Sequence, residues 1–413
     1  MFISLTNFQG ERKRVKRGKQ GNKWQLFYAK DFQSLMYPCF MFCRIMGIFP
    51  YKINATTFEV SKSHYILSII FICIHSIYIL VMLLSSSLVA RNDINMSILP
   101  GVLGYKCIFV FGGFIMVITF ILRKPQMRIL QIILKISSKL PSESYKKLSR
   151  LIHAKDIIGS VSLIGLILFF IFTLQINCYF YINIITVVFQ MDMLYINYVF
   201  VLKACFKRIN DNLMYMQDYM TFDNMRDSRL TYQQKNVFLI IELKALKKEH
   251  LTLSDTVKKL NIIFSMQLVA TVIMTFCTIT INLYYYITYI LEVQIVLMST
   301  WVIITHMSFL FSFTYYITKI AIVIWVCETS KNEALQITTS IHDIINSITD
   351  KQIKYEVVTK KKTTFLIYIK LFVRDRTKKE FKLWKSLLCF CSNLELTFYV
   401  KLFDNSLNQF SNK

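Results

Sequence analysis

Long apolar runs divide the chain into six stretches, each long enough to cross a bilayer as a helix. They lie near residues 65–88, 98–122, 157–174, 180–202, 262–287 and 296–326. About 20 apolar residues are enough to span a hydrocarbon core of roughly 30 Å. Glycine (10) and proline (5) are scarce among the 413 residues, which favours long helices over the many short strands of a barrel. We therefore predict an all-α, polytopic membrane protein.

The polar gaps between these runs alternate in charge. The chain has 49 Lys and Arg residues against 24 Asp and Glu residues, a formal net charge of +25. Nearly all of the basic residues precede the first run or follow the second, fourth and sixth. Since cytoplasmic loops are enriched in Lys and Arg, the N-terminus is predicted to be cytoplasmic, and the loops at 89–97, 175–179 and 288–295 to be outside. This topology argues against a G-protein-coupled receptor, whose N-terminus is outside, and it explains the positive charge without nucleic acid.

Two of the basic segments repeat apolar residues at intervals of three and four, at 129–156 and 237–261. We expect spans two to five to continue as helices well beyond the membrane. The alternative is a set of separate amphipathic helices that lie on anionic lipid. On the outer side, Asn95 begins an Asn-Met-Ser sequon and is a candidate for glycosylation.

Ionisable and amide side chains within the spans are the first candidates for a ligand site, because such groups are costly in a bilayer. Gln190 and Asp192 lie near the middle of the fourth run, and Lys106 lies in the second. Opposite charges at comparable depth lead us to expect that Lys106 and Asp192 pair. Such a pair is either a polar anchor beneath a ligand or a structural ion pair.

The outer halves of the fifth and sixth runs combine polar and aromatic side chains. The candidates are Asn282, Tyr284, Tyr285, Trp301 and His306. Sugars need this mixture, since hydroxyl groups bind amides while ring faces pack on aromatics. The alternatives are an interfacial aromatic belt and, for His306, a buried hydrogen-bonding residue.

Enzyme motifs are absent from the sequence. It contains no G-x-S-x-G, H-E-x-x-H or Walker loop. The ten cysteines are scattered and indicate neither a disulfide framework nor a metal site. We predict no catalytic residue, cofactor or metal.

Three segments resemble insect gustatory receptors, which are similar to insect odorant receptors. They are LMYPCFMFCRIMGIFPYKI (35–53), FQMDMLYINYVFVLKACFKRINDNL (189–213) and VCETSKNEALQITTSIHDIINSITDKQIKYEV (326–357). The resemblance implies a tastant-gated, non-selective cation channel of the plasma membrane with seven helices per subunit. It also implies a homo- or hetero-tetramer around one pore lined by the last span, with the tastant bound between spans two to six. The alternatives are a chemoreceptor that signals through cytoplasmic partners, a transporter, or a non-conducting product.

The final segment departs from this family. The chain divides into a basic cytoplasmic tail (1–34), a receptor domain (35–357) and a basic segment (358–413) where the last span is expected. That segment contains no run of 18 apolar residues. It is interpreted as a mistranslated intron or shifted frame, as a truncated receptor, or as a divergent span at 383–403 whose Glu395 faces a cation pore.

Overall fold

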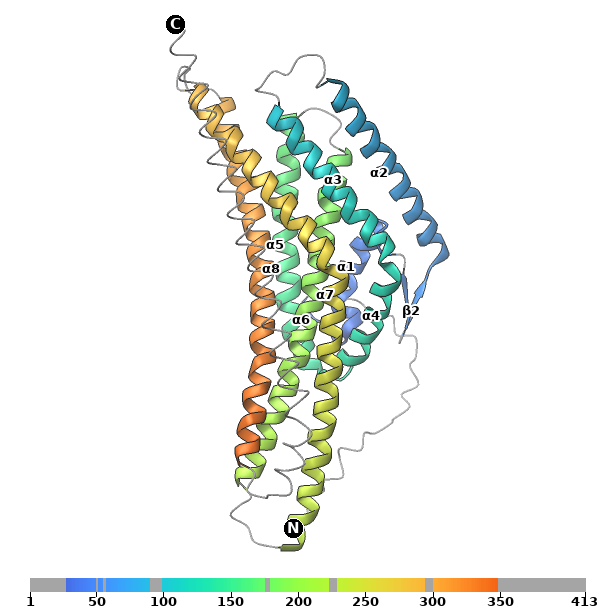
Figure 1. Cartoon of the computed structure of the whole chain (residues 1–413), viewed down its shortest axis with the longest axis vertical. Helices are drawn as coiled ribbons and strands as arrows, with labels where there is room; N and C mark the ends of the chain where they lie inside the picture. The colour runs from blue at the N-terminus through green and yellow to red at the C-terminus, as the bar shows by residue number, and fades with distance from the viewer. Residues whose placement is uncertain are drawn as a thin grey trace.

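The computed structural model describes residues 27–49, 51–54, 57–89, 99–174, 179–222, 229–293 and 300–347. These residues form eight helices and one small hairpin (Figure 1). The helices are α1 (Phe32–Ile45), α2 (Lys62–Val89), α3 (Leu99–Ile121), α4 (Arg123–Ser137), α5 (Ser142–Leu174), α6 (Tyr179–Phe222), α7 (Arg229–Val293) and α8 (Thr300–Ser347). Five helices are long and apolar enough to cross a membrane, or six if α3 and α4 are counted as one bent span. The prediction of an all-helical polytopic membrane protein is confirmed. Asn95, Glu395 and the segment 358–413 lie outside the described residues.

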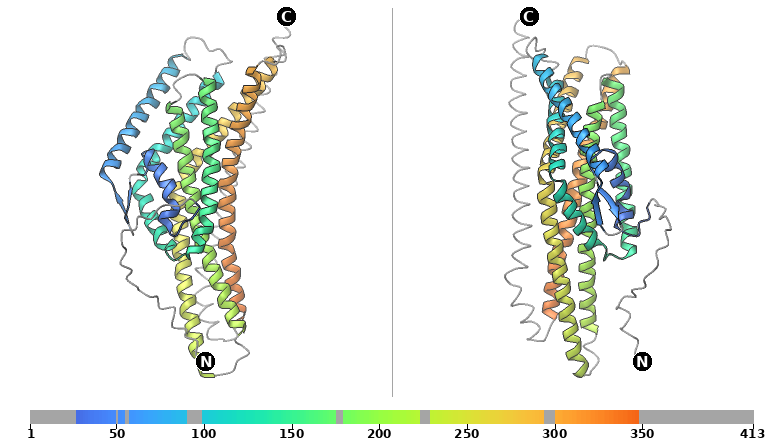
Figure 2. Two further views of the ribbon diagram at one scale, coloured as in Figure 1. Left: turned by 180° about the vertical axis from the view of Figure 1, so that it is seen from behind. Right: turned by 90° about the vertical axis from the view of Figure 1, so that its right-hand side faces the viewer.

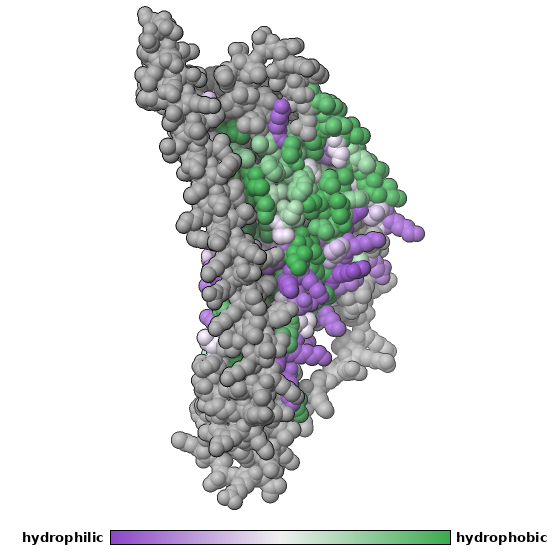
Figure 3. Space-filling model, in the orientation of Figure 1, coloured by the Kyte–Doolittle hydropathy of each residue, from purple (hydrophilic) through white to green (hydrophobic). Residues whose placement is uncertain are grey.

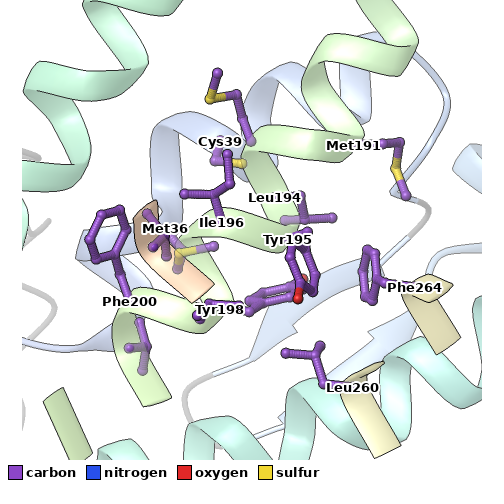
Figure 4. Close-up of a cluster of buried hydrophobic side chains, with 14 of the residues drawn as sticks. Met36, Cys39, Met191, Leu194, Tyr195, Ile196, Tyr198, Phe200, Leu260 and Phe264 are labelled. Carbon is purple, nitrogen blue, oxygen red and sulfur yellow. The ribbon is translucent and has the colours of Figure 1, made fainter. Parts of the chain in front are cut away.

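Helix α6 is the centre of the bundle. It contacts α1, α3, α4, α5, α7 and α8, and the ribbon views show it between the outer helices (Figures 1 and 2). In its most apolar stretch 94% of the residues are buried. Figure 4 shows part of this core, in which α6 side chains lie against Met36 and Cys39 of α1 and Leu260 and Phe264 of α7. A helix that is apolar on all sides is expected to be buried on all sides.

Helix α2 stands at the edge of the bundle, tilted away from the other helices (Figure 1). It packs mainly against α3 and touches α6 where Tyr78 stacks on Phe180, with ring centroids 3.7 Å apart. Its outer face carries exposed apolar side chains at intervals of three and four, namely Ile66, Ile70, Ile74, Ile77 and Val81. This face suits the acyl chains of the bilayer.

Four of the helices continue far beyond the length of a membrane span. Helices α5, α6, α7 and α8 have 33, 44, 65 and 48 residues. The prediction that the spans continue as longer helices is confirmed for α5, α6 and α7. It is wrong for the second span, because the chain turns by 66° between α3 and α4. The apolar face of α4 is buried and the helix packs on α6 and α7, so α4 neither extends α3 nor lies free on lipid.

The hairpin was not predicted. Strands β1 (Tyr51–Asn54) and β2 (Thr57–Val60) pair antiparallel between α1 and α2. Phe58 packs edge-on against Phe40 and Phe49, whose rings stack at 4.5 Å. Strands of four residues are too short to give a clear alternating pattern. An aromatic cluster shared with α1 fixes the hairpin instead.

Candidate functional site

A buried ion pair joins α6 to α8 in the interior of the bundle. Lys319 Nζ lies 2.7 Å from Asp192 Oδ2, and the two side chains are 4% and 0% exposed. Thr271 of α7 donates its hydroxyl hydrogen to Asp192 Oδ1 at 3.2 Å. Three long helices therefore meet at one carboxylate. Where water is excluded, such a pair is retained only if each charge keeps its partner.

The expected pair of Lys106 and Asp192 is wrong. Asp192 faces α8 and is paired with Lys319, whereas Lys106 lies half-buried on α3. Hydropathy places both lysines inside spans, but it gives no information on which helix faces which. The one available signal was that Lys319 is the sole Lys, Arg, Asp or Glu between residues 296 and 326. A lone charge in such a run needs a partner.

A polar stripe on α7 leads from this pair toward the C-terminal end of the helix. It consists of Gln267, Thr271, Thr275, Thr278 and Asn282, which are three or four residues apart and so share one face of the helix. The first four are buried and Asn282 is half-buried. At 1.5 Å per residue, Asn282 lies roughly 16 Å along the helix from Thr271. Of this stripe, sequence reasoning proposed Asn282 as a ligand candidate. The spacing of three and four residues was the available signal for the others.

Three buried polar atoms of the stripe have no hydrogen-bond partner among the described residues. They are the amide Nε2 of Gln267, Thr275 Oγ1 and the amide Nδ2 of Asn282. An unsatisfied buried donor costs roughly 1–3 kcal/mol. A ligand hydroxyl or carbonyl oxygen that accepts from Asn282 would remove this cost. The stripe thus offers a hydrogen-bond donor near the C-terminal end of α7 and a buried charge pair about 16 Å away along the helix.

Helix α8 faces the stripe with polar and aromatic side chains of its own. Ser312, Tyr316 and Lys319 are buried and share one face, since they are four and three residues apart. Nearer the start of α8, Phe309 stacks on Tyr286 of α7, with ring centroids 4.2 Å apart. The C-terminal part of α7 and the N-terminal part of α8 therefore contact each other through aromatic rings.

Gln190 does not join this cluster. Its amide Nε2 donates to the backbone oxygen and the Sγ of Cys39 in α1, both at 3.2 Å. Residues two apart on a helix point in directions about 200° apart, so Gln190 and Asp192 face opposite sides of α6. Gln190 attaches α1 to the central helix.

The remaining candidates lie at the facing ends of α7 and α8. Tyr284 and Tyr285 are in the last turns of α7, whereas Trp301 and His306 are in the first turns of α8. The side chain of Tyr284 is half-buried. The side chains of the other three fall outside the described part of the structure. Within that part, no group of three His, Cys, Asp or Glu side chains could hold a metal ion.

Comparison with known proteins gives one match. A family model described as "7tm Chemosensory receptor" matches residues 36–357, which is well over half of the chain. A comparison with curated protein sequences finds no match.

Proposed function

Because the chain belongs to the 7tm chemosensory receptor family, the family of the insect gustatory receptors, we propose that it is a taste receptor that acts as a tastant-gated cation channel. The family consists of multi-pass membrane receptors for small molecules and not of enzymes. The resemblance inferred from three short segments is confirmed, and the matched range of 36–357 nearly equals the predicted one. The ligand, the pore and the tetramer belong to the proposal.

The proposed orientation places the N-terminus in the cytoplasm of a cell that carries the receptor in its plasma membrane. The C-terminal end of α6, the N-terminal end of α7 and the C-terminal end of α8 gather at one end of the molecule (Figure 1). The segment between α6 and α7 and the segment after α8 are both rich in Lys and Arg. The positive-inside rule assigns this end to the cytoplasm.

The polar stripe on α7 is the observation that carries the ligand site. It connects the unsatisfied amide of Asn282 with the Asp192–Lys319 pair along one continuous face. We place the tastant at the outer end of this face, against Asn282, Tyr284, Tyr285, Trp301 and His306. A sugar is preferred over a purely apolar compound, since its hydroxyl groups satisfy amides while its ring faces pack on aromatics.

Gating in this proposal is a change in how α7 and α8 pack. A ligand opens a channel only if it binds the open state more tightly than the closed state. The tastant bridges the outer ends of α7 and α8. At depth the Asp192–Lys319 pair holds α8 to α6, and Thr271 of α7 donates to the same carboxylate. The bound ligand therefore favours one position of the outer end of α8 relative to α7, while the contact at Asp192 and Lys319 stays in place.

The proposal is tested by recording whole-cell currents from cells that express the full chain, with a panel of sugars and bitter compounds. We expect a sugar-evoked cation current that persists when G proteins are blocked. Asn282→Leu removes the amide and should raise the half-maximal sugar concentration by about tenfold, the equivalent of one hydrogen bond. Thr318→Val, a substitution at an exposed position on α8, is the matched control and should leave the half-maximal sugar concentration unchanged.

Two results would favour other functions. A current that disappears with G-protein blockade would show that the receptor signals through cytoplasmic partners. The absence of any evoked current, with the chain present at the cell surface, would favour a non-conducting receptor.

A further inference from the structure

The bend between α3 and α4 contains a buried arginine in contact with two aromatic rings. Arg123 is the first residue of α4 and is 6% exposed. Its guanidinium carbon lies 3.6 Å from the ring centroid of Phe120 on α3 and 4.3 Å from that of Tyr65 on α2. Cation–π contacts at these distances hold the guanidinium in place between two helices.

The polar partners of this guanidinium are all neutral. Nε donates to the backbone oxygen of Phe120 at 3.1 Å, Nη1 lies 3.5 Å from Ser68 Oγ, and the Tyr65 hydroxyl is a further hydrogen-bond partner. Among the described residues no carboxylate pairs with Arg123. A buried cation without an anion is unfavourable, so the site suits an anionic acceptor.

Arg123 lies at the boundary between the lipid-facing and the polar surface. Lys124 and Arg128 are exposed on the same helix, and Lys62 and His64 are exposed at the start of α2, just before Tyr65. Figure 3 shows the apolar surface over α2 and α3 ending in a band of hydrophilic side chains directly below. One exposed carboxylate, Glu59 of β2, belongs to the same region, and its Cα pairs with that of Lys52 across the hairpin. Basic residues dominate the boundary.

An apolar hollow adjoins the arginine. It is a small, partly open hollow with a cavity volume of about 20 Å³, between the end of α1 and helices α2, α3 and α6. The lining residues are Met46, Gly47, Ile48, Ile72, Met116, Thr119, Phe120 and Val187. Phe120 is thus in contact with both the hollow and the guanidinium. Ile72 lies one helical turn beyond Ser68 on α2.

We propose that the site around Arg123 at the bend between α3 and α4, here called the elbow, binds an anionic phospholipid of the cytoplasmic leaflet. The phosphate accepts hydrogen bonds from Arg123, and Lys124 and Lys62 add positive potential around it. The first methylenes of an acyl chain lie in the hollow between α2 and α3. Two observations favour this ligand. The basic side chains at the site are complementary to an anionic headgroup, and the site lies at the edge of the apolar surface, where the headgroups of the cytoplasmic leaflet are found. The bound lipid would attach the peripheral helix α2 to the rest of the bundle.

The test uses the full chain reconstituted in phosphatidylcholine nanodiscs that contain a small fraction of phosphatidylserine or a phosphoinositide. After extraction into mild detergent, native mass spectrometry counts the anionic lipids that each chain retains. We expect Arg123→Gln to lower retention by about fivefold, the usual contribution of one basic residue near a membrane surface. Lys124→Gln should lower it about twofold. Arg150→Gln, at an exposed arginine on α5 with the same charge change, is the control and should retain lipid as the wild type does.

Three outcomes would overturn the proposal. The first is equal retention by the wild type, Arg123→Gln and Lys124→Gln. The second applies if Arg123→Gln fails to give a monodisperse helical protein. In that case Lys124→Gln is compared with Arg150→Gln, and equal retention by those two variants rejects the site. The third is complete displacement of the lipid by inorganic phosphate, which would assign the elbow to a soluble phosphate. Retention unaffected by inorganic phosphate supports the lipid.

Discussion

Helices α2 and α6 are both apolar, but they occupy opposite environments. The most apolar stretch of α2 has the higher hydropathy, yet 11% of it is buried, against 94% for α6. The buried helix is also the one with amide and carboxylate side chains in its apolar stretch. Helix α6 buries Asn183, Gln190, Asp192 and Asn197. In a bilayer, high hydropathy shows that a helix is compatible with lipid and not that it is buried in protein. The helix that faces lipid therefore has the higher hydropathy. Polar side chains inside a span identify the helix that packs against others.

The consequence is that different forces hold the two helices. Apolar side chains gain little on moving from lipid to protein, so close packing and polar contacts must fix α6. Asp192 contacts α7 and α8, Gln190 contacts α1, and Asn197 donates to Asp156 of α5 at 3.1 Å. Helix α2 needs fewer such contacts, because lipid serves as one of its neighbours.

The largest effect is expected from breaking the buried pair. Asp192→Leu leaves the Lys319 ammonium without its counter-charge and should lower the free energy of unfolding by about 3–5 kcal/mol. Asp211→Leu, at an exposed site further along α6, should change it by less than about 0.5 kcal/mol. Unfolding of the purified full chain in bilayer mimetics measures both. Equal losses of unfolding free energy would show that removing an aspartate from α6 destabilises the protein wherever it lies, and that the buried pair is not the cause.

A smaller effect is expected from equal truncations on the two helices. Leu194 of α6 is 3% exposed, whereas Leu80 of α2 is 58% exposed. Leu194→Ala leaves a cavity and should cost about 1–3 kcal/mol, because packing is lost while the transfer term from lipid is small. Leu80→Ala should cost less than about 0.5 kcal/mol, since lipid fills the space. Similar costs in the same unfolding assay would mean that α2 is as closely packed as α6.

Two adjacent glycines of α3 sharpen the comparison, because they face different helices. A Cβ added at Gly112 would lie 2.2 Å from Ile184 Cγ2 of α6, and one at Gly113 would lie 2.7 Å from Ile79 Cδ1 of α2. Helix α6 is enclosed and cannot move, so Gly112→Ala should cost about 1–2 kcal/mol. Gly113→Ala should be close to neutral, since α2 can shift and alanine favours the helix by up to about 1 kcal/mol. A reversed order in thermal unfolding would contradict the proposed rigidity of α6.

The smallest effect concerns the hairpin beside α2. Tyr51 donates its hydroxyl hydrogen to the backbone oxygen of Arg123 at 2.7 Å, and burial raises the pKa of Tyr51 from 10 to about 12. Tyr51→Phe should cost about 0.5–1.5 kcal/mol at neutral pH.

The sign of its pH dependence follows from the raised pKa. The folded protein holds this proton more tightly than the unfolded chain, so the stabilisation is complete below pH 10 and is lost as the pH rises through about 12. The difference in stability between the wild type and Tyr51→Phe should shrink over that interval. Tyr215→Phe, at a residue 74% exposed, provides the control. A difference that stays constant from pH 9 to pH 12 would exclude the tyrosine as its source.

Sequence patterns predicted the parts of the structure that depend on local composition. The apolar runs gave the helical membrane fold, and the intervals of three and four gave the long extensions of α5, α6 and α7. Asp192 was singled out because a carboxylate in an apolar run is costly wherever it points. Three short segments were enough to indicate the family.

The features that sequence missed depend on contacts between helices. The partner of Asp192 depends on which face of α8 packs on α6, and no period along one helix contains that information. The bend after Ile121 arises because α4 packs its apolar face on α6 and α7. Gln190 resembled Asp192 in depth and chemistry, yet a rotation of about 200° along α6 places it against α1.

The most direct test of this account is a double-mutant cycle on the buried pair. The free energy of unfolding of the full chain is measured for the wild type, Asp192→Leu, Lys319→Met and the double variant. If the pair holds the central helix, each single variant loses about 3–5 kcal/mol and the double variant recovers most of that loss, because no unpaired charge remains. If the losses simply add, the two residues act independently, and the Asp192–Lys319 contact does not hold α6 at the centre of the bundle.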